Sequence, residues 1–229
     1  MRKFFQLLHS LSLGCGKLPL VGVIALCTSV ALGRLTATQT WKGPFNQSAE
    51  VLSADAQLID GILSKRAPDL GMTLRRQLGV AIAQESLRAA YDPLLVLAII
   101  NVESEFDESA LSNKGARGLM QIKPSTLHFL AEKEGLRLTR SEVSSDAALC
   151  VRLGIRYLRQ LQDRFGDLDL ALMAYNAGPA RLTQAMRART VEPFRRYPRL
   201  VRREFRRFRE GEGLKGHWSL AEREEVSIR

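Results

Sequence analysis

The sequence predicts a mainly α-helical protein built around one sizeable core. Apolar residues recur at helical spacing in several successive segments, while the alternation typical of strands is weak outside a short hairpin or loop region around Gly115 to Ile122. The length of 229 residues and the hydrophobic content of 45% suit one globular domain with extensions. We divide the chain into residues 1–33, 34–70, 71–190 and 191–229.

Residues 1–33 form an apolar segment with a basic start, most apolar from Leu18 to Gly33. This stretch is shorter than the roughly 20 residues that a membrane-spanning helix needs. It is typical of a signal peptide, or of an uncleaved signal anchor if the preceding residues extend it. Lipidation at Cys15 or Cys27 is a weaker alternative, because neither follows a good lipobox. Each outcome exports the remaining chain to the cell envelope, where we expect it in the periplasm, tethered to the inner membrane if the anchor is retained.

Residues 34–70 have a mixed, polar composition that predicts a tether or linker with one short helical stretch near Ala54 to Leu63. The domain proper is expected to begin near Thr73. From there apolar residues recur at helical spacing, namely Leu74, Leu78, Ile82 and Leu87.

The next helix should be the centre of the domain. Asp92 suits an N-cap, and Pro93 suits the first helical position, where a missing N–H costs nothing. Leu94 to Ile100 is apolar on all sides, which predicts a helix buried on all sides. Two further helices are expected from Asp146 to Phe165 and from Asp169 to Ala177.

Residues 191–229 are predicted to form a basic C-terminal helix and tail, with aromatic residues at helical spacing between arginines up to Arg209. The formal net charge of +10 favours a polyanionic partner: nucleic acid, anionic lipid or anionic wall polymer. Because the aromatic residues should pack on the domain, the arginines are expected to form a solvated face. An exported chain meets little nucleic acid, so we favour an anionic envelope polymer or membrane surface and expect no nucleic-acid partner.

The three cysteines, Cys15, Cys27 and Cys150, lack the CxxC spacing of a metal or redox site. We therefore expect no metal and no cofactor, and we expect a monomer.

Glu103 is the strongest catalytic candidate. It lies four residues after Ile99 and three before Phe106, so it shares their apolar face near the end of the central helix. Loss of hydration there should raise the pKa of the carboxyl group, as a general acid requires near neutral pH. An acidic residue at a helix end is more often solvated than catalytic, so the prediction depends on the residues that follow.

The segment after this helix can bring polar groups close to Glu103. Gly115 and Gly118 allow tight turns that would carry Met120 and Gln121 toward the helix end. The Gln121 amide can exchange hydrogen bonds with a sugar N-acetyl group, and the Ser112 hydroxyl can orient a carboxyl group or an amide.

Two sequence motifs resemble those of the soluble lytic transglycosylase family. The segment ESEFDESALSNKGARGLMQIKPST, Glu103 to Thr126, resembles its first signature, and ALMAYNAGP, Ala171 to Pro179, resembles its second. Between them, RLGIRYLRQL from Arg152 to Leu161 is similar to the family's Gly-x-x-Tyr-Leu helix. The motifs follow the family's order.

The resemblance implies a lysozyme-like (goose-type) helical fold and makes residues 71–190 a lytic transglycosylase catalytic domain acting on peptidoglycan glycan strands. It implies that Glu103 is the single catalytic residue, acting first as acid and then as base, with a 1,6-anhydromuramoyl product. The residues that it implies for substrate binding are Ser112, Met120, Gln121, Tyr175 and Asn176.

Two other functions are alternatives to the lytic transglycosylase. A muramidase would hydrolyse the same bond and would normally need a second carboxylate, for which Asp107, Glu108 and Asp146 are candidates. A non-catalytic glycan-binding or scaffold module would not require Glu103.

Overall fold

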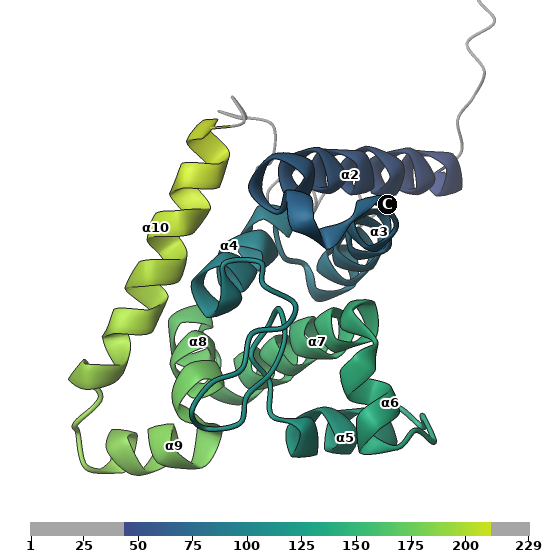
Figure 1. Ribbon diagram of the computed structural model, residues 1–229. Coiled ribbons are helices and arrows are strands. Elements are labelled where there is room, and N and C mark those ends of the chain that lie inside the picture. Colours follow the sequence, from purple (N-terminus) through teal and green to yellow (C-terminus); the bar gives the residue numbers. More distant parts are fainter. Residues whose placement is uncertain (1–43, 212–229) are drawn as a thin grey trace, which may run out of the picture. The chain divides into compact units, whose positions relative to one another are not determined.

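The computed structural model describes residues 44–211, and helices make up most of this part of the chain (Figure 1). Beyond the helices, it contains isolated antiparallel bridges that pair Arg117 with Leu111 and with Ile122, where the sequence predicted a short hairpin or loop region. The helices, in chain order, are α2 (Pro44–Arg66), η1 (Pro68–Leu70), α3 (Met72–Ala89), α4 (Pro93–Ser104), α5 (Pro124–Lys133), α6 (Arg140–Ser145), α7 (Ala147–Phe165), α8 (Leu168–Ala177), α9 (Pro179–Arg187), η2 (Glu192–Arg195) and α10 (Arg196–Gly211).

Helix α4 is the buried centre, as predicted. The Asp92 side chain accepts a hydrogen bond from the Leu94 amide at 2.9 Å and caps the helix, with Pro93 in its first turn. Every residue from Leu94 to Ile100 is buried. Helices α3 and α10 pack against it, so its apolar side chains have neighbours on more than one side.

Helix α2 differs from the tether predicted for residues 34–70. The expected short stretch near Ala54 to Leu63 is part of a 23-residue helix that packs along α3 (Figure 1). Ile59, Ile62 and Leu63 lie fully inside the same core as α4. Burial of these three side chains makes α2 part of the packed domain, because each would lose its apolar contacts if the helix detached.

The middle of the domain contains both expected and unexpected helices. Helices α7 and α8 match the two that were predicted, and Asp146 and Asp167 cap them through the amides of Leu149 and Leu170. Helices α5, α6 and α9 were not predicted; each is short, so its apolar period repeats too few times to be recognised.

The predicted C-terminal helix is divided into η2 and α10, with α10 packed against α4 and α8 (Figure 1). Its buried face carries Tyr197, Val201 and Phe208. Up to Gly211, the C-terminal segment is therefore a helix that packs on the domain through its aromatic and apolar face, as predicted.

The predicted signal peptide or anchor lies outside the described residues. Between Pro44 and Gly211, none of the helices has the length and apolar character needed to span a membrane.

Candidate active site

Glu103 lies in the last turn of α4, at a helix end with an unusual backbone. Glu105 and Phe106 follow with φ angles of 52° and 67°, the left-handed region that residues other than glycine rarely adopt. The turn lets Phe106 enter the core, where its ring meets that of Phe208 edge-on at 6.4 Å. This contact fixes the end of α4 against α10 and leaves Glu103 facing a cleft.

The Glu103 carboxyl group has the acidity of a general acid near neutral pH. Burial raises the pKa of Glu103 to about 7, and a hydrogen bond from Tyr197 acts in the opposite direction by stabilising the carboxylate. The Tyr197 hydroxyl donates to Oε1 at 2.5 Å. The balance leaves a carboxyl group that can exchange its proton near neutral pH.

The segment from Ser112 to Gln121 is tied to the end of α4. The Ser104 hydroxyl donates to the carbonyl oxygen of Leu119 at 2.9 Å. The Gln121 amide nitrogen donates to the carbonyl oxygens of Ala110 and Gly118, both at 3.0 Å. These bonds place the turn beside Glu103 and leave the Gln121 amide oxygen as its group for a ligand.

The Ser112 hydroxyl is held by its own turn. Its oxygen accepts hydrogen bonds from the amides of Lys114 and Ala116, at 3.3 and 3.0 Å. Both contacts use the oxygen as acceptor, so the hydroxyl proton remains available to a substrate acceptor.

A cleft of about 630 Å³ opens above Glu103. Its walls come from the Ser112–Lys123 segment, the start of α5, α7, the α8–α9 junction and η2. Of the residues expected to bind substrate, those that line it are Ser112, Gln121, Tyr175 and Asn176. The structure thus brings four of the five together with Glu103.

Met120 is the exception, because it lies beneath the cleft. Its side chain is only 2% exposed and packs on Gly154, where an added Cβ would stand 2.5 Å from the Met120 sulfur. Its carbonyl oxygen accepts a hydrogen bond from the Tyr175 hydroxyl at 2.9 Å. Met120 therefore supports the cleft floor, where a substrate does not reach it.

Tyr197 is the site residue that sequence reasoning missed. Its position among arginines and its helical spacing indicated a packing residue, and Tyr175 was expected to be the phenol near the carboxyl group. Tyr175 does lie near Glu103, because burial and the charge of Glu103 raise the pKa of Tyr175. Its hydroxyl, however, bonds to Met120, and Tyr197 makes the direct contact with Glu103. The three basic residues that line the cleft, Lys114, Lys123 and Arg181, were also not anticipated.

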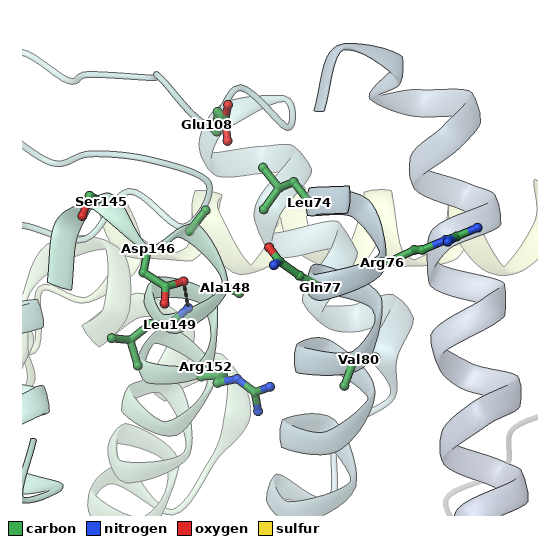
Figure 2. A pocket seen from close by; sticks show the side chains of 11 residues that line it. Leu74, Arg76, Gln77, Val80, Glu108, Ser145, Asp146, Ala148, Leu149 and Arg152 are labelled. Carbon is green, nitrogen blue, oxygen red and sulfur yellow. Dashed lines mark hydrogen bonds between the residues drawn. The ribbon is translucent and has the colours of Figure 1, made fainter. Parts of the chain in front are cut away.

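A second hollow, of about 880 Å³, lies between α3 and the start of α7 (Figure 2). Leu74, Gln77 and Val80 face Asp146 and Arg152 across it, and it contains none of the expected site residues. Asp146 is engaged there in capping α7 (Figure 2). This hollow is therefore separate from the cleft that holds Glu103.

Residues 80–197, just over half of the chain, match the family described as the transglycosylase SLT domain, so the chain belongs to this family. Tyr197 is the last residue of the match. The membership predicted from the two motifs is thereby confirmed.

Two characterised relatives show the same similarity over part of the chain. The transglycosylase of Enterobacteria phage PRD1 is 36% identical over 101 residues, covering 44% of this chain and 33% of that protein. Membrane-bound lytic murein transglycosylase D of Escherichia coli (strain K12) is 32% identical over 97 residues, covering 42% of this chain and 21% of that protein. The matches thus extend over a third or less of each relative's length.

Two solved structures share the fold. An inactive mutant of the lytic transglycosylase Slt of Pseudomonas aeruginosa has a TM-score of 0.51 and 24% identity, covering 71% of this chain and 30% of that one. The 70 kDa soluble lytic transglycosylase of Escherichia coli has a TM-score of 0.52 and 19% identity, covering 73% of this chain and 31% of that one. They confirm the predicted mainly α, lysozyme-like fold.

Proposed function

We propose that this chain is a peptidoglycan lytic transglycosylase that cleaves the β-1,4 bond between N-acetylmuramic acid and N-acetylglucosamine. The observation that carries the proposal is a partly buried carboxyl group, Glu103, with a pKa of about 7, on the wall of a cleft of about 630 Å³. A group of this acidity can both give and take a proton at neutral pH. The family to which the chain belongs and the names of its relatives support the same activity.

In the proposed reaction Glu103 acts twice. It first protonates the glycosidic oxygen as the bond to the muramoyl C1 breaks, and the muramoyl N-acetyl group stabilises the positive charge that develops at C1. The Glu103 carboxylate then takes the proton of the muramoyl C6 hydroxyl as that oxygen attacks C1. The products are a 1,6-anhydromuramoyl end and a free N-acetylglucosamine hydroxyl, and Glu103 regains its proton.

Tyr197 has a positioning role in this scheme. Its hydroxyl bond to Oε1 holds the carboxyl group in place and stabilises the carboxylate formed after the first step. Ser112, Gln121 and Asn176 line the same cleft and supply hydroxyl and amide groups for the glycan, with Tyr175 as part of the wall.

The position of the other carboxylates favours this mechanism over hydrolysis by a two-carboxylate muramidase. Among the described residues that line the cleft, Glu103 is the one acid. Asp107 is exposed and accepts two hydrogen bonds from Ser109, while Glu108 and Asp146 line the separate hollow between α3 and α7. None of the three candidates lines the cleft.

The test compares Glu103→Gln with Glu105→Gln on purified peptidoglycan. Glu103→Gln should lower the cleavage rate by roughly 10²- to 10⁴-fold, because the amide cannot transfer the proton. Glu105, exposed two residues away, should be replaceable with little loss. Mass spectrometry should find anhydromuramoyl products from the wild-type protein.

Two results would contradict the proposal. Muropeptides with reducing ends would identify a hydrolase. Full activity of Glu103→Gln, or no cleavage by the wild-type protein of any peptidoglycan, would favour the scaffold alternative.

We also propose that the protein acts in the cell envelope as a monomer, exported by its N-terminal segment. The arginines of α10 supply a contact for an anionic envelope polymer or membrane surface. Several arginines of η2 and α10 are already paired with acids: Arg195 and Arg199 with Glu192, Arg202 with Asp169, and Arg203 and Arg207 with Glu204. Arg196, Arg206 and Arg209 have no acidic partner among the described residues. Arg209 lies over the Phe205 ring, so Arg196 and Arg206 carry this proposed contact.

A further inference from the structure

The cleft above Glu103 adjoins another hollow, of about 500 Å³, between α5 and α7. Thr126, Tyr157 and Pro179 line both spaces, so the two meet along these three side chains. We call the second space the distal hollow. A strand bound across Glu103 can therefore extend past Tyr157 without leaving the surface of the protein.

We call the cleft and the distal hollow together the groove. The lining of the groove is basic. The cleft is bordered by Lys114, Lys123 and Arg181, and the distal hollow by Lys133 and Arg164. None of these five side chains belongs to an ion pair within residues 44–211. The acid that faces them from the groove lining is Glu103, whose pKa burial raises to about 7.

Both cations of the distal hollow are held in place by neutral groups. The Lys133 ammonium donates to the Gln160 side-chain oxygen at 3.1 Å. The Arg164 guanidinium lies over the Phe165 ring, 5.2 Å from its centre. Both contacts restrict the side chains and leave their charges uncompensated, so an anionic ligand meets cations that are already ordered.

The basic groups do not act on the catalytic carboxyl group itself. The pKa of Glu103 is set by burial and by the Tyr197 hydrogen bond, and none of the cations lowers it. A cation within a few ångströms would favour the carboxylate and weaken the acid. The basic side chains thus lie where they can bind a charged ligand without changing the chemistry at Glu103.

The distal hollow also offers an apolar contact. Phe129 of α5 lines it and is 62% exposed, the largest exposed fraction among the large hydrophobic side chains of the described residues. Single exposed apolar residues are common. This one stands beside Lys133 and Arg164, where the ring can cover the apolar face of a sugar or a methyl group while the cations bind a carboxylate.

We propose that the distal hollow is a subsite for a carboxylate carried by the muramoyl strand, bound by Lys133 and Arg164 beside Phe129. The inference rests on the proposed function, because it takes the ligand of the cleft to be such a strand. The carboxylate has two sources: the lactyl group of a strand without peptides, or the stem peptide of a substituted one. A chitin oligomer has the same β-1,4 backbone and lacks both.

The experiment measures binding by a protein that carries Glu103→Gln, so that the ligand stays intact. Isothermal titration at low salt compares three soluble ligands: uncross-linked peptide-bearing strands, the same strands after an amidase has removed the peptides, and chitin oligomers. Lys133→Gln with Arg164→Gln removes the two charges. Arg137→Gln with Arg187→Gln is the matched control, since both arginines are exposed and line neither space.

We expect the Lys133/Arg164 variant to weaken binding of at least one carboxylate-bearing ligand by about tenfold, because two exposed charge contacts are lost. Chitin binding should change less than about twofold, and the control should match the parent protein. Loss confined to peptide-bearing strands would assign the carboxylate to the stem peptide. Equal loss for both strands would show that the subsite accepts either carboxylate, and loss confined to denuded strands would assign it to the lactyl group.

An equal loss for chitin, no loss for either strand, or the same loss in the control would overturn the inference. These outcomes do not depend on cleavage. The proposed activity can therefore stand if the distal hollow fails this test, and a failure of the activity would appear separately in the product analysis.

Discussion

At the scale of single residues, the acidity of Glu103 is a balance of two opposing effects. Removing the carboxyl group from water disfavours the charged carboxylate, and the hydrogen bond from Tyr197 offsets part of that penalty. Burial is the larger effect, so the pKa rises to about 7. Raising the pH through this value ionises Glu103 and removes the acid, so cleavage should slow above neutral pH.

Tyr197→Phe tests this balance. Loss of the hydroxyl removes the effect that lowers the pKa of Glu103, so the alkaline limb of the pH–rate profile should move to higher pH. The maximal rate should fall by about tenfold, because the carboxyl group is less firmly positioned. The profile of kcat/KM against pH is the measurement.

Tyr175→Phe is the comparison, because its hydroxyl bonds to the Met120 carbonyl oxygen and not to Glu103. The idea fails if the alkaline limb of the pH–rate profile does not move in Tyr197→Phe. It also fails if that limb moves by the same amount in Tyr175→Phe, because Tyr197 would then not specifically set the pKa of Glu103.

At the scale of the helices, α2 and α3 approach each other closely at Gly79. A Cβ placed on Gly79 of α3 would stand 2.7 Å from the backbone carbonyl oxygen of Ala56 in α2. Contact between real atoms at that distance is repulsive, and a backbone atom cannot rotate away as a side chain can. The missing side chain of Gly79 therefore lets α2 lie against the core.

Gly79→Ala should destabilise the protein by about 1–3 kcal/mol, as overpacking of a tight contact does. Gly61→Ala is the matched control in α2, because nothing lies within 4 Å of the added Cβ. It should be neutral or stabilising by up to about 1 kcal/mol. Urea unfolding measures both, and a Gly79→Ala protein as stable as wild type would mean that α2 does not pack as described.

At the scale of the whole molecule, basic side chains of the described residues lie on two different surfaces. The basic groups of the groove face the substrate, while those of α10 lie on a helix whose other face packs on α4. Deleting residues 191–229 would not isolate the second surface, since it also removes Tyr197 from Glu103.

Arg196→Gln with Arg206→Gln examines the α10 surface without disturbing the site. Because surface charges are screened by salt, the variant should bind intact sacculi or anionic lipid vesicles about two- to fivefold more weakly at low salt. The difference should vanish at high salt, while cleavage of short soluble strands should not change. Co-sedimentation with sacculi and with vesicles measures the binding. Equal binding by variant and wild type would show that the α10 arginines do not contact these polyanions.

Much of the fold and of the site follows from the sequence because the signals are local. The Asp92–Pro93 start and the apolar run to Ile100 define α4 within a dozen positions, and cap and period need no distant partner. The two motifs select Glu103, Gln121 and Tyr175 by residue type and spacing. The short helices α5, α6 and α9 escape such reasoning, since one to three turns do not establish a period.

By itself the sequence determined the helical class, the central helix, the catalytic candidate and the family. The tertiary structure decided which side chains meet: that Tyr197, 94 positions after Glu103, touches its carboxyl group, that Met120 lies beneath the cleft, and that α2 belongs to the core. It also joined Lys133 and Arg164 to the groove that contains Glu103. Local propensity and spacing describe neighbours along the chain, whereas burial and charge depend on neighbours in space, which only the packing of the helices provides.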